Sequence, residues 1–329
     1  MTTVEAPRNS HLHPAYRTAP RLLRVAEIVP LTESVKHFRF TPTDGTPLIP
    51  FQPGSHVIVT AGDHRNAYSL VDDGLLPTSY GISVLRRGEG GGSDRLHDHL
   101  AVGDEIEVEG PRSMFAPVAD QHHALLVAGG IGVTPILSHA RAAVRDGGTA
   151  DVLYSYRPGH AAHLTELREL AERPGITLHE ATGVPETTEA LTRLLRHQPL
   201  GTHAYACGPA PMLETYRALA AGAGWPAARV HLEMFAAPEQ DPGEPFTVTL
   251  TASGRTVEVP SGVSALQSLL DAGVAVPNMC RQGVCGECRI PVTGGEVVHR
   301  DFVLTEEERT RGDSMLCCVS RGSNIEVPL

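Results

Sequence analysis

The cysteines are distributed very unevenly along this chain. Five of the six fall within the last 50 of its 329 residues, and Cys207 stands alone. The five are Cys280, Cys285, Cys288, Cys317 and Cys318. A secreted disulfide-bonded domain spreads its cysteines along its length, whereas a metal site gathers thiols in a reducing compartment. The clustering therefore predicts a metal centre near the C-terminus.

The spacing within the group identifies the kind of centre. Cys280-x4-Cys285-x2-Cys288, followed after 29 residues by Cys318, is the spacing of plant-type [2Fe-2S] clusters. Glycines 283 and 286 in the same loop let backbone N–H groups approach the sulfurs. The adjacent Cys317 competes for the fourth ligand position. Because Cys318 gives the better register with the following Val-Ser-Arg, we predict Cys280, Cys285, Cys288 and Cys318 as ligands.

Zinc and disulfides are the alternative interpretations of the same cysteines. Structural zinc commonly uses two short cysteine pairs, and this chain offers only one Cys-x2-Cys. The N-terminus has neither a basic nor an apolar region, so we expect no export signal and a cytoplasmic protein. Disulfides are not expected in that compartment. The iron–sulfur interpretation is therefore favoured.

Composition excludes several classes of function. Hydrophobic residues make up 41% of the chain and charged residues 20%, which is typical of a folded protein. The net charge is −11 and no predicted domain is basic, which argues against nucleic acid or an anionic membrane as partner. No apolar run is long enough for a membrane helix. No heptads or long apolar helix face indicate obligate assembly, so we expect a monomer.

The N-terminal third has the pattern of short β-strands. After a polar arm over residues 1–20, apolar residues alternate with polar ones at Phe38 and Phe40, at Val57 and Val59, and over 82–84 and 105–108. Gly, Pro and Asp separate these runs. Several short alternating strands predict an antiparallel β-barrel over residues 21–118.

The pattern changes over residues 119–236. A buried strand over 124–128 leads into Gly129-Gly-Ile-Gly-Val-Thr-Pro135 and a helix to about residue 145. Further strands over 151–156 and 203–207, with a helix over 211–221, predict a parallel α/β sheet. The glycine turn is not G-x-G-x-x-G, and such a turn can be purely structural. It would still admit a pyrophosphate at a helix N-terminus, where Pro135 suits the first turn.

The remaining residues predict a third domain. An exposed linker over 237–245 precedes strands over 246–250 and 256–259, which flank a turn and predict a hairpin. Ser264 and Gln267 form a capping-box pattern at the start of a helix. The third domain, over 246–329, would hold the cysteine cluster.

Six stretches together resemble the phthalate dioxygenase reductase family (class IA of the ferredoxin-NADP reductase superfamily), the three-domain reductases that supply bacterial oxygenases. The stretches are 65–70 (Arg-Asn-Ala-Tyr-Ser-Leu), 91–93 (Gly-Gly-Ser), 129–135, 207–209 (Cys-Gly-Pro), 233–235 (Glu-Met-Phe) and the cysteine loop. Order and spacing match from about residue 20 to the end. The resemblance implies an FMN-binding barrel, an NADH-binding α/β domain and a ferredoxin domain of the β-grasp type.

The resemblance also implies a flavin site on the barrel. The implied contacts are Arg65, Tyr68, Ser69, Leu70, Arg86, Gly91, Gly92 and Ser93, with Tyr68 and Ser69 beside the isoalloxazine and Arg65 and the glycine turn at the phosphate. Two departures from the family pattern concern the phosphate. The family places an arginine two residues before the tyrosine, where this chain has Asn66. A family lysine after the next strand is replaced by Leu85 or Arg86.

The implied nucleotide site lies in the α/β domain. Its contacts are Gly130, Gly132, Thr134, Pro135, Arg157, Cys207, Gly208, Pro209 and Phe235. Ser69, Cys207 and Phe235 would act at the nicotinamide, with Phe235 covering the flavin; a plain buried cysteine is the alternative for Cys207. Arg157 has no acidic partner nearby, so the sequence alone leaves NADPH open, and we follow the family in expecting NADH.

The resemblance implies the reductase component of a multicomponent oxygenase. Electrons would pass from NADH through FMN and a [2Fe-2S] cluster to a terminal oxygenase, which we expect to be a Rieske non-haem iron enzyme. A cytochrome P450 is the alternative partner. A non-catalytic iron–sulfur binding or sensor module is the alternative of another class. Glu306-Glu307-Glu308 would steer a partner or form a solvated surface.

Overall fold

The computed structural model describes residues 19–88, 90–113, 115–119, 121–235 and 240–329. The chain divides near residue 236 into two compact units, each considered by itself below. Residues 1–18 of the predicted arm and 237–239 of the predicted linker lie outside the described residues. In the described part of the chain no helix is both long and apolar enough to cross a bilayer.

The first unit begins with an antiparallel sheet that curls on itself. Its strands are β1 (Arg21–Pro30), β2 (Val35–Pro42), β3 (Ser55–Ala61), β4 (His64–Ser69), β5 (Tyr80–Leu85) and β6 (Glu105–Ser113), in the order β4-β3-β6-β1-β2-β5. A bridge between Leu70 and Ile82 brings the two edges together. Phe38, Phe40 and Val57 fill the interior, which confirms the predicted alternation. Helix α1 (Gly92–His99) packs against β3, β4 and β5.

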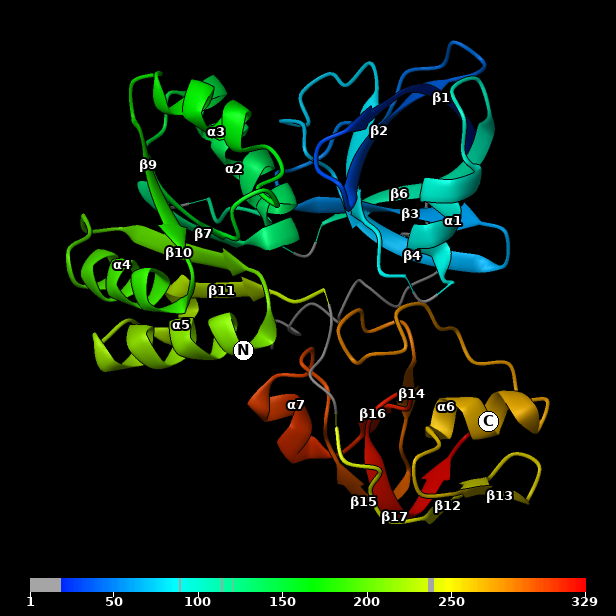
Figure 1. Ribbon diagram of the computed structural model, residues 1–329. Coiled ribbons are helices and arrows are strands. Elements are labelled where there is room, and N and C mark those ends of the chain that lie inside the picture. The colour runs from blue at the N-terminus through cyan, green and yellow to red at the C-terminus, as the bar shows by residue number, and fades with distance from the viewer. Residues whose placement is uncertain (1–18, 89, 114, 120, 236–239) are drawn as a thin grey trace, which may run out of the picture. The chain divides into compact units, whose positions relative to one another are not determined.

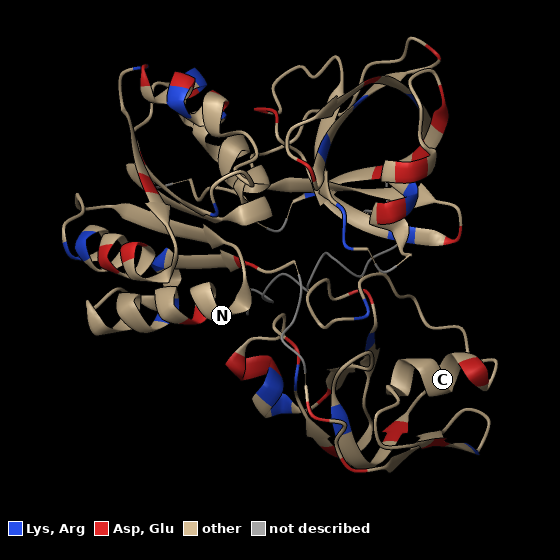
Figure 2. Ribbon diagram, in the orientation of Figure 1, with Lys and Arg blue, Asp and Glu red and all other residues tan. Residues whose placement is uncertain are grey.

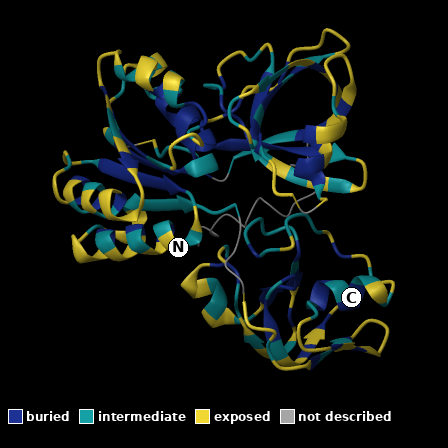
Figure 3. Ribbon diagram, viewed as in Figure 1, coloured by how far each residue is buried: buried dark blue, intermediate teal, exposed yellow. Residues whose placement is uncertain are grey.

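A five-stranded parallel sheet forms the rest of the first unit. Its strands are β7 (His123–Gly129), β8 (Ala150–Tyr156), β9 (Ile176–Thr182), β10 (Thr202–Cys207) and β11 (Val230–Glu233), in the order β11-β10-β7-β8-β9. Helices α2 (Val133–Asp146) and α3 (Leu164–Ala171) cover one face, and α4 (Val184–Arg196) and α5 (Ala210–Gly222) the other (Figure 1). Figure 3 shows the strands buried between helices whose outer faces are exposed. The predicted α/β architecture is confirmed.

The strand order creates a place for a ligand. β7 and β10 are neighbours, and the helices that follow them, α2 and α5, lie on opposite faces of the sheet. The loops after these two strands therefore diverge at the carboxyl edge. In open α/β sheets this topological switch point is where ligands bind.

The barrel and the parallel sheet share a core. Val35, Val71 and Phe115 pack in the same apolar cluster as Val133 and Ile136 of α2. This common core makes one compact unit of two regions that differ in sequence pattern. The predicted bounds, 21–118 and 119–236, stay predictions.

The second unit is an α+β domain. Its main sheet has β12 (Phe246–Leu250), β13 (Arg255–Val259), β15 (Gly294–Val298) and β17 (Arg321–Val327), in the order β13-β12-β17-β15. β14 (Arg289–Pro291) pairs with β16 (Ser314–Leu316), and the helices are α6 (Ala265–Asp271) and α7 (Glu306–Arg311). The predicted hairpin is confirmed by the β12–β13 pairing. The cap is confirmed by a 3.1 Å hydrogen bond from Gln267 N to Ser264 Oγ.

Candidate functional site

The cysteine loop brings its thiols together in pairs. Cys280 lies beside Cys285, and this contact, with backbone amides, lowers the pKa of Cys280 to about 6. Cys288 lies beside Cys317 and Cys318, which lower its pKa to about 4. The same contacts raise the pKa of Cys285, Cys317 and Cys318, so each group of thiols favours one thiolate, the form in which cysteine binds metals.

The donor set fits a two-iron cluster. Among the described residues no three His, Cys, Asp or Glu side chains converge on a single ion. A [2Fe-2S] cluster does not require that, because its four thiolates divide between two irons. The pairs Cys280 with Cys285 and Cys288 with Cys318 match this division.

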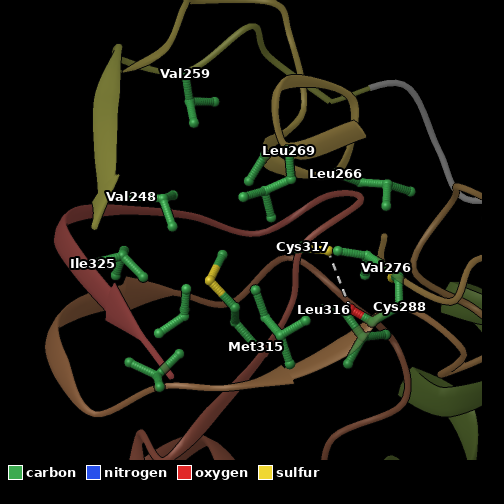
Figure 4. Packing of buried hydrophobic residues seen from close by; sticks show 14 of the residues in the cluster. Val248, Val259, Leu266, Leu269, Val276, Cys288, Met315, Leu316, Cys317 and Ile325 are labelled. Atoms are coloured by element: carbon green, nitrogen blue, oxygen red, sulfur yellow. Dashed lines mark hydrogen bonds between the residues drawn. The ribbon is translucent and has the colours of Figure 1, made fainter. Parts of the chain in front are cut away.

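Backbone contacts distinguish Cys317 from Cys318. Cys317 is wholly buried in the apolar core, and its Sγ donates to the Cys288 carbonyl oxygen at 3.2 Å (Figure 4). Cys318 Sγ instead accepts a hydrogen bond from Gly283 N at 3.2 Å. Amide donors to sulfur are what a cluster-bound thiolate needs, so this contact supports Cys318 as the fourth ligand.

The acidic run on α7 carries balanced charge. Glu306, Glu307 and Glu308 face Arg309, Arg311 and Arg289, at distances of 3.7, 3.4 and 2.9 Å respectively. Figure 2 shows both signs on this helix. The arrangement favours the solvated-surface interpretation over the steering of a partner.

One face of β4, called the phosphate face below because a phosphate is predicted there, adjoins the start of α1. His64, Asn66 and Tyr68 share this face because side chains alternate along a strand. The start of α1 abuts it: a Cβ on Gly92 would lie 3.1 Å from Asn66 Oδ1. No side chain caps this helix at Gly91, so its first amides, including that of Ser93, are open to an anion.

The Tyr68 hydroxyl shows whether this face of β4 suits a flavin. Its Oη is buried without a partner at hydrogen-bond geometry among the described residues, and burial raises the pKa of the phenol, an effect that the nearby Asn66 side chain opposes. A buried hydroxyl without a partner is costly unless a ligand completes it. Together with the open amides of α1, it fits an aromatic ligand with a phosphate, as FMN has.

Arg65 and Arg86, expected at the phosphate, have other partners. Arg65 is on the opposite face of β4 from Tyr68 and forms an ion pair with the buried Glu109 of β6. Arg86 Nη2 lies 2.8 Å from Asp98 Oδ2 on α1. The residue that the structure brings to the phosphate face is Asn66. The two-residue period of the strand could have identified it.

The other two residues predicted to contact the flavin, Ser69 and Leu70, lie at the end of β4. Ser69 is buried at the end of β4, opposite His56 of β3. Leu70 is fully buried in the barrel core and makes the bridge to Ile82.

The glycine turn after β7 interlocks with the end of β10. A Cβ on Gly132 would lie 2.2 Å from the Cys207 carbonyl oxygen, and one on Gly208 would lie 3.0 Å from Gly129 Cα. Gly130 has a φ of +53° and open space where a Cβ would point. These conditions allow a dinucleotide backbone to approach the turn closely.

The first turn of α2 supports the same interpretation. Thr134 donates its hydroxyl to Ile131 O at 3.0 Å, and the buried Pro135 occupies the first helical turn. No side chain caps the helix N-terminus. A 3-10 turn over Gly130–Gly132 precedes the helix, and the Val133 amide donates to Gly130 O and Ile131 O. The amides of this uncapped turn and the helix dipole favour a pyrophosphate.

Cys207 and Glu233 lie opposite each other at the carboxyl edge. They are register partners in the parallel pair β10–β11. Burial raises the pKa of the Cys207 thiol well above its ordinary value, so the thiol is neutral. Burial also raises the pKa of Glu233 to about 8, and its Oε2 is buried without a partner in the described part of the chain. The sequence indicated Glu233 only as part of the Glu-Met-Phe stretch and not as a site residue.

Three further residues were predicted at the nucleotide site. Phe235 is half-buried and packs against the apolar cluster shared by the barrel and the parallel sheet. Pro209 is exposed at the N-cap of α5. Arg157 is exposed immediately after β8, at the same carboxyl edge.

Comparisons with known proteins agree with this geometry. The family model "Dimethylamine monooxygenase subunit DmmA-like, N-terminal domain" matches residues 105–230, and "2Fe-2S iron-sulfur cluster binding domain" matches 248–322. The heme-dependent oxidative N-demethylase beta subunit of Ectopseudomonas mendocina is 41% identical, over 93% of this chain and 97% of its own.

Two solved structures resemble the chain over nearly its full length. Phthalate dioxygenase reductase, described as a modular structure for electron transfer from pyridine nucleotides to [2Fe-2S], is 32% identical. It has a TM-score of 0.73 and covers 96% of this chain and 98% of its own. An intact type IV self-sufficient cytochrome P450 monooxygenase is 31% identical, with a TM-score of 0.77, over 94% of this chain and 41% of its own.

Proposed function

Because the chain belongs to the phthalate dioxygenase reductase family of oxygenase reductases, we propose that it passes electrons from NADH, through FMN and a [2Fe-2S] cluster, to a terminal oxygenase. The observation that carries the proposal is that one chain holds three matching binding elements. These are the unpartnered Tyr68 hydroxyl beside open helix amides, the interlocked glycine turns at the switch point, and the paired thiols.

The barrel residues bind and orient the flavin. When bound, FMN takes a hydride from NADH and releases its electrons singly to the cluster, which matches a two-electron donor to a one-electron acceptor. The amides of Gly92 and Ser93 and the side chain of Asn66 hold the phosphate. Tyr68 gives its hydroxyl to the ligand. Arg65, paired with Glu109, links β4 to β6 across the intervening strand β3.

The α/β residues orient the nucleotide. The turn over 130–135 holds the pyrophosphate at the N-terminus of α2, and Arg157 meets the far ribose. Cys207 and Ser69 line the nicotinamide position, where the neutral Cys207 thiol packs without competing as a nucleophile. Glu233 is protonated below about pH 8, so it adds no negative charge beside an anionic coenzyme and can donate a hydrogen bond. Phe235 covers the flavin until the nicotinamide enters.

The partner is a terminal oxygenase, and three kinds of enzyme are candidates. A Rieske non-haem iron dioxygenase agrees with the resemblance to phthalate dioxygenase reductase. A haem-dependent enzyme that oxidises amines is the second candidate, and the 41% identity to a heme-dependent N-demethylase subunit favours it. A fused P450 relative makes a P450 partner the third. The chain would work as a monomer in the cytoplasm, where reducing conditions protect the thiols.

Reconstitution tests this proposal. Purified protein is stripped of flavin, and NADH-driven reduction of cytochrome c is measured before and after adding FMN, FAD or riboflavin. We expect activity to disappear on stripping and to return with FMN, since riboflavin lacks the phosphate that the helix amides bind. Return with riboflavin as readily as with FMN would overturn the phosphate site, and activity without any flavin would overturn the route.

A further inference from the structure

A chain of buried polar groups joins the barrel to the α/β half, and none of its members is assigned to either cofactor. His37 of β2 and Ser83 of β5 belong to the barrel, and His163 and Glu166 lie at the start of α3. The first three are each less than a tenth exposed. His37 Nδ1 lies 3.0 Å from Ser83 Oγ, which lies 2.7 Å from His163 Nε2. His163 Nδ1 lies 2.8 Å from Glu166 Oε1.

Two arginines and Asp72 close this chain into a ring. Arg141 of α2 forms an ion pair with Glu166 and donates to Asp72 Oδ1 at 3.3 Å. Asp72 Oδ2 lies 3.5 Å from Arg39 Nη1, and Arg39 Nη2 lies 3.5 Å from His37 Nε2. The interlobe ring therefore consists of His37, Ser83, His163, Glu166, Arg141, Asp72 and Arg39.

One arrangement of protons satisfies every member of the interlobe ring. The Glu166 carboxylate only accepts, so His163 carries its proton on Nδ1 and accepts the Ser83 hydroxyl proton at Nε2. Ser83 Oγ then accepts from His37 Nδ1, which leaves His37 Nε2 to face the Arg39 guanidinium. Both histidines are neutral in this arrangement. A second proton on His37 would face a cation, and one on His163 would remove the acceptor of the Ser83 hydroxyl.

The interlobe ring attaches to both cofactor-binding segments. Asp72 comes two residues after Leu70, at the end of the flavin motif. His163 ends the loop that starts with Arg157 at the carboxyl edge of β8. His163 also has a φ of +59°, a strained backbone for a residue other than glycine, and such strain persists only where surrounding contacts fix it.

We propose that the interlobe ring is a proton-sensitive clasp, which holds the loop over residues 157–163, beginning at Arg157, against the flavin-bearing barrel and opens when His37 is protonated. This proposal extends the proposed function. It rests on that function only for the identity of the ligands that the two segments bind. In the clasp His163 is a positioning residue, because it acts through the loop that precedes it.

The charged groups around the histidines set the direction of the pH dependence. Burial, then His163 and Arg39, lower the pKa of His37 to about 4; Glu166 opposes them and Arg141 adds to them. Burial opposes ionisation of Glu166, yet the hydrogen bond from His163 lowers its pKa, so its carboxylate stays charged. An open clasp returns His37 to its ordinary pKa of 6.5. Acid therefore favours opening as the pH falls from 6.5 towards 4.

Hydrogen exchange followed by mass spectrometry measures the opening in the full-length protein. Amide exchange over residues 157–167 is compared at pH 8 and pH 5, after correction for the intrinsic effect of pH on exchange. We expect about 30-fold more opening at pH 5, from the two pKa values of His37. Strand β12 in the other unit serves as an internal reference. A corrected ratio close to one for residues 157–167 would overturn the proposal.

Three variants separate a proton-sensitive clasp from simple packing. Ser83→Ala removes the hydroxyl in the ring and should leave residues 157–167 open even at pH 8. Ser138→Ala removes another interlobe bond, from Ser138 Oγ to Asp72 O at 2.6 Å, and should keep the pH response. His37→Asn keeps a donor towards Ser83 but does not titrate, so protection should be equal at both pH values.

The outcomes distinguish this proposal from the proposed function. Loss of the pH response in Ser138→Ala, or a full response in His37→Asn, would overturn the clasp. If Ser83→Ala does not fold, the wild type and His37→Asn still decide. Hydrogen exchange does not depend on electron transfer. If the clasp proposal is wrong, the flavin and iron contents of the protein are unaffected. If the proposed function is wrong, the protein lacks flavin or iron.

Discussion

The cysteine loop would bind its cofactor through side chains, whereas the flavin face of the barrel would bind its cofactor mainly through backbone amides. In the loop, Cys280, Cys285, Cys288 and Cys318 each supply one sulfur. On the barrel, the proposed flavin contacts are the open amides of α1 and the Tyr68 hydroxyl, which lacks a partner in the described part of the chain. Metal ligands must be particular residue types at particular spacings, while an amide cradle can be built from almost any sequence that folds correctly. The two sites should therefore respond differently to substitution.

Substitution of a thiol should have the largest effect. Cys318→Ser and Cys285→Ser are expected to reduce NADH-driven cytochrome c reduction to background while flavin-dependent oxidation of NADH continues, because only the cluster is lost. Cys317→Ser is the matched control. Its hydroxyl can still donate to Cys288 O, so the cluster should remain. Iron analysis and the two activities check this, and loss of iron in Cys317→Ser with retention in Cys318→Ser would reverse the assignment.

The glycine turn should be the most sensitive backbone position. In Gly132→Ala the new Cβ would meet the Cys207 carbonyl oxygen at 2.2 Å, so β7 and β10 must separate. We expect the KM for NADH to rise at least about tenfold and the unit to lose about 1–3 kcal/mol of stability. Gly147→Ala, with positive φ but open space at the other end of α2, is the control. It should cost about 1 kcal/mol and leave the KM unchanged. Equal KM values for the two variants would count against the turn as a binding element.

Acid should destabilise the first unit through its buried histidines. Burial lowers the pKa of both His37 and His139 to about 4, from an ordinary 6.5. Between these values the unfolded chain binds more protons, so stability is full above pH 6.5 and falls as the pH decreases. From pH 7 to pH 5 we expect a loss of about 2 kcal/mol for each histidine.

The single tryptophan allows the stability of the first unit to be measured at each pH. Trp225 donates to Leu195 O at 2.7 Å within the first unit, so its fluorescence during urea unfolding reports that unit. In His139→Gln a side-chain amide can still donate towards Phe115 O, and about half of the acid sensitivity should disappear. An acid response identical to that of the wild type would contradict the role of His139.

The smallest effect is expected at the flavin phosphate. Asn66→Arg places a cation on the phosphate face and should tighten FMN binding about tenfold, as one charge-assisted hydrogen bond does. Arg65→Ala should change FMN affinity little, because Arg65 pairs with Glu109 on the other face. Fluorescence titration of the stripped protein with FMN measures both. A large loss of affinity in Arg65→Ala together with no gain in Asn66→Arg would restore Arg65 as the phosphate ligand.

The same contrast explains what the sequence could predict. The three architectures, the hairpin at β12–β13 and the cap at Ser264 follow from hydrophobic period and local chemistry, and all are confirmed. Arg65 could not be placed from a motif, because its position differs from Asn66 by one residue and a strand puts neighbours on opposite faces. Glu233 could not be recognised because its importance depends on burial beside Cys207. The interlobe ring joins residues far apart in sequence and has no motif.

In the proposed route, electrons travel from NADH through the flavin to the cluster within this chain. We would test this route by an anaerobic titration with NADH, followed by visible absorption. We expect about one FMN and about two irons per chain, and bleaching of both the flavin and the iron–sulfur bands as NADH is added. Iron–sulfur bands without flavin, or bands that do not bleach with NADH, would contradict it and leave an iron–sulfur binding module.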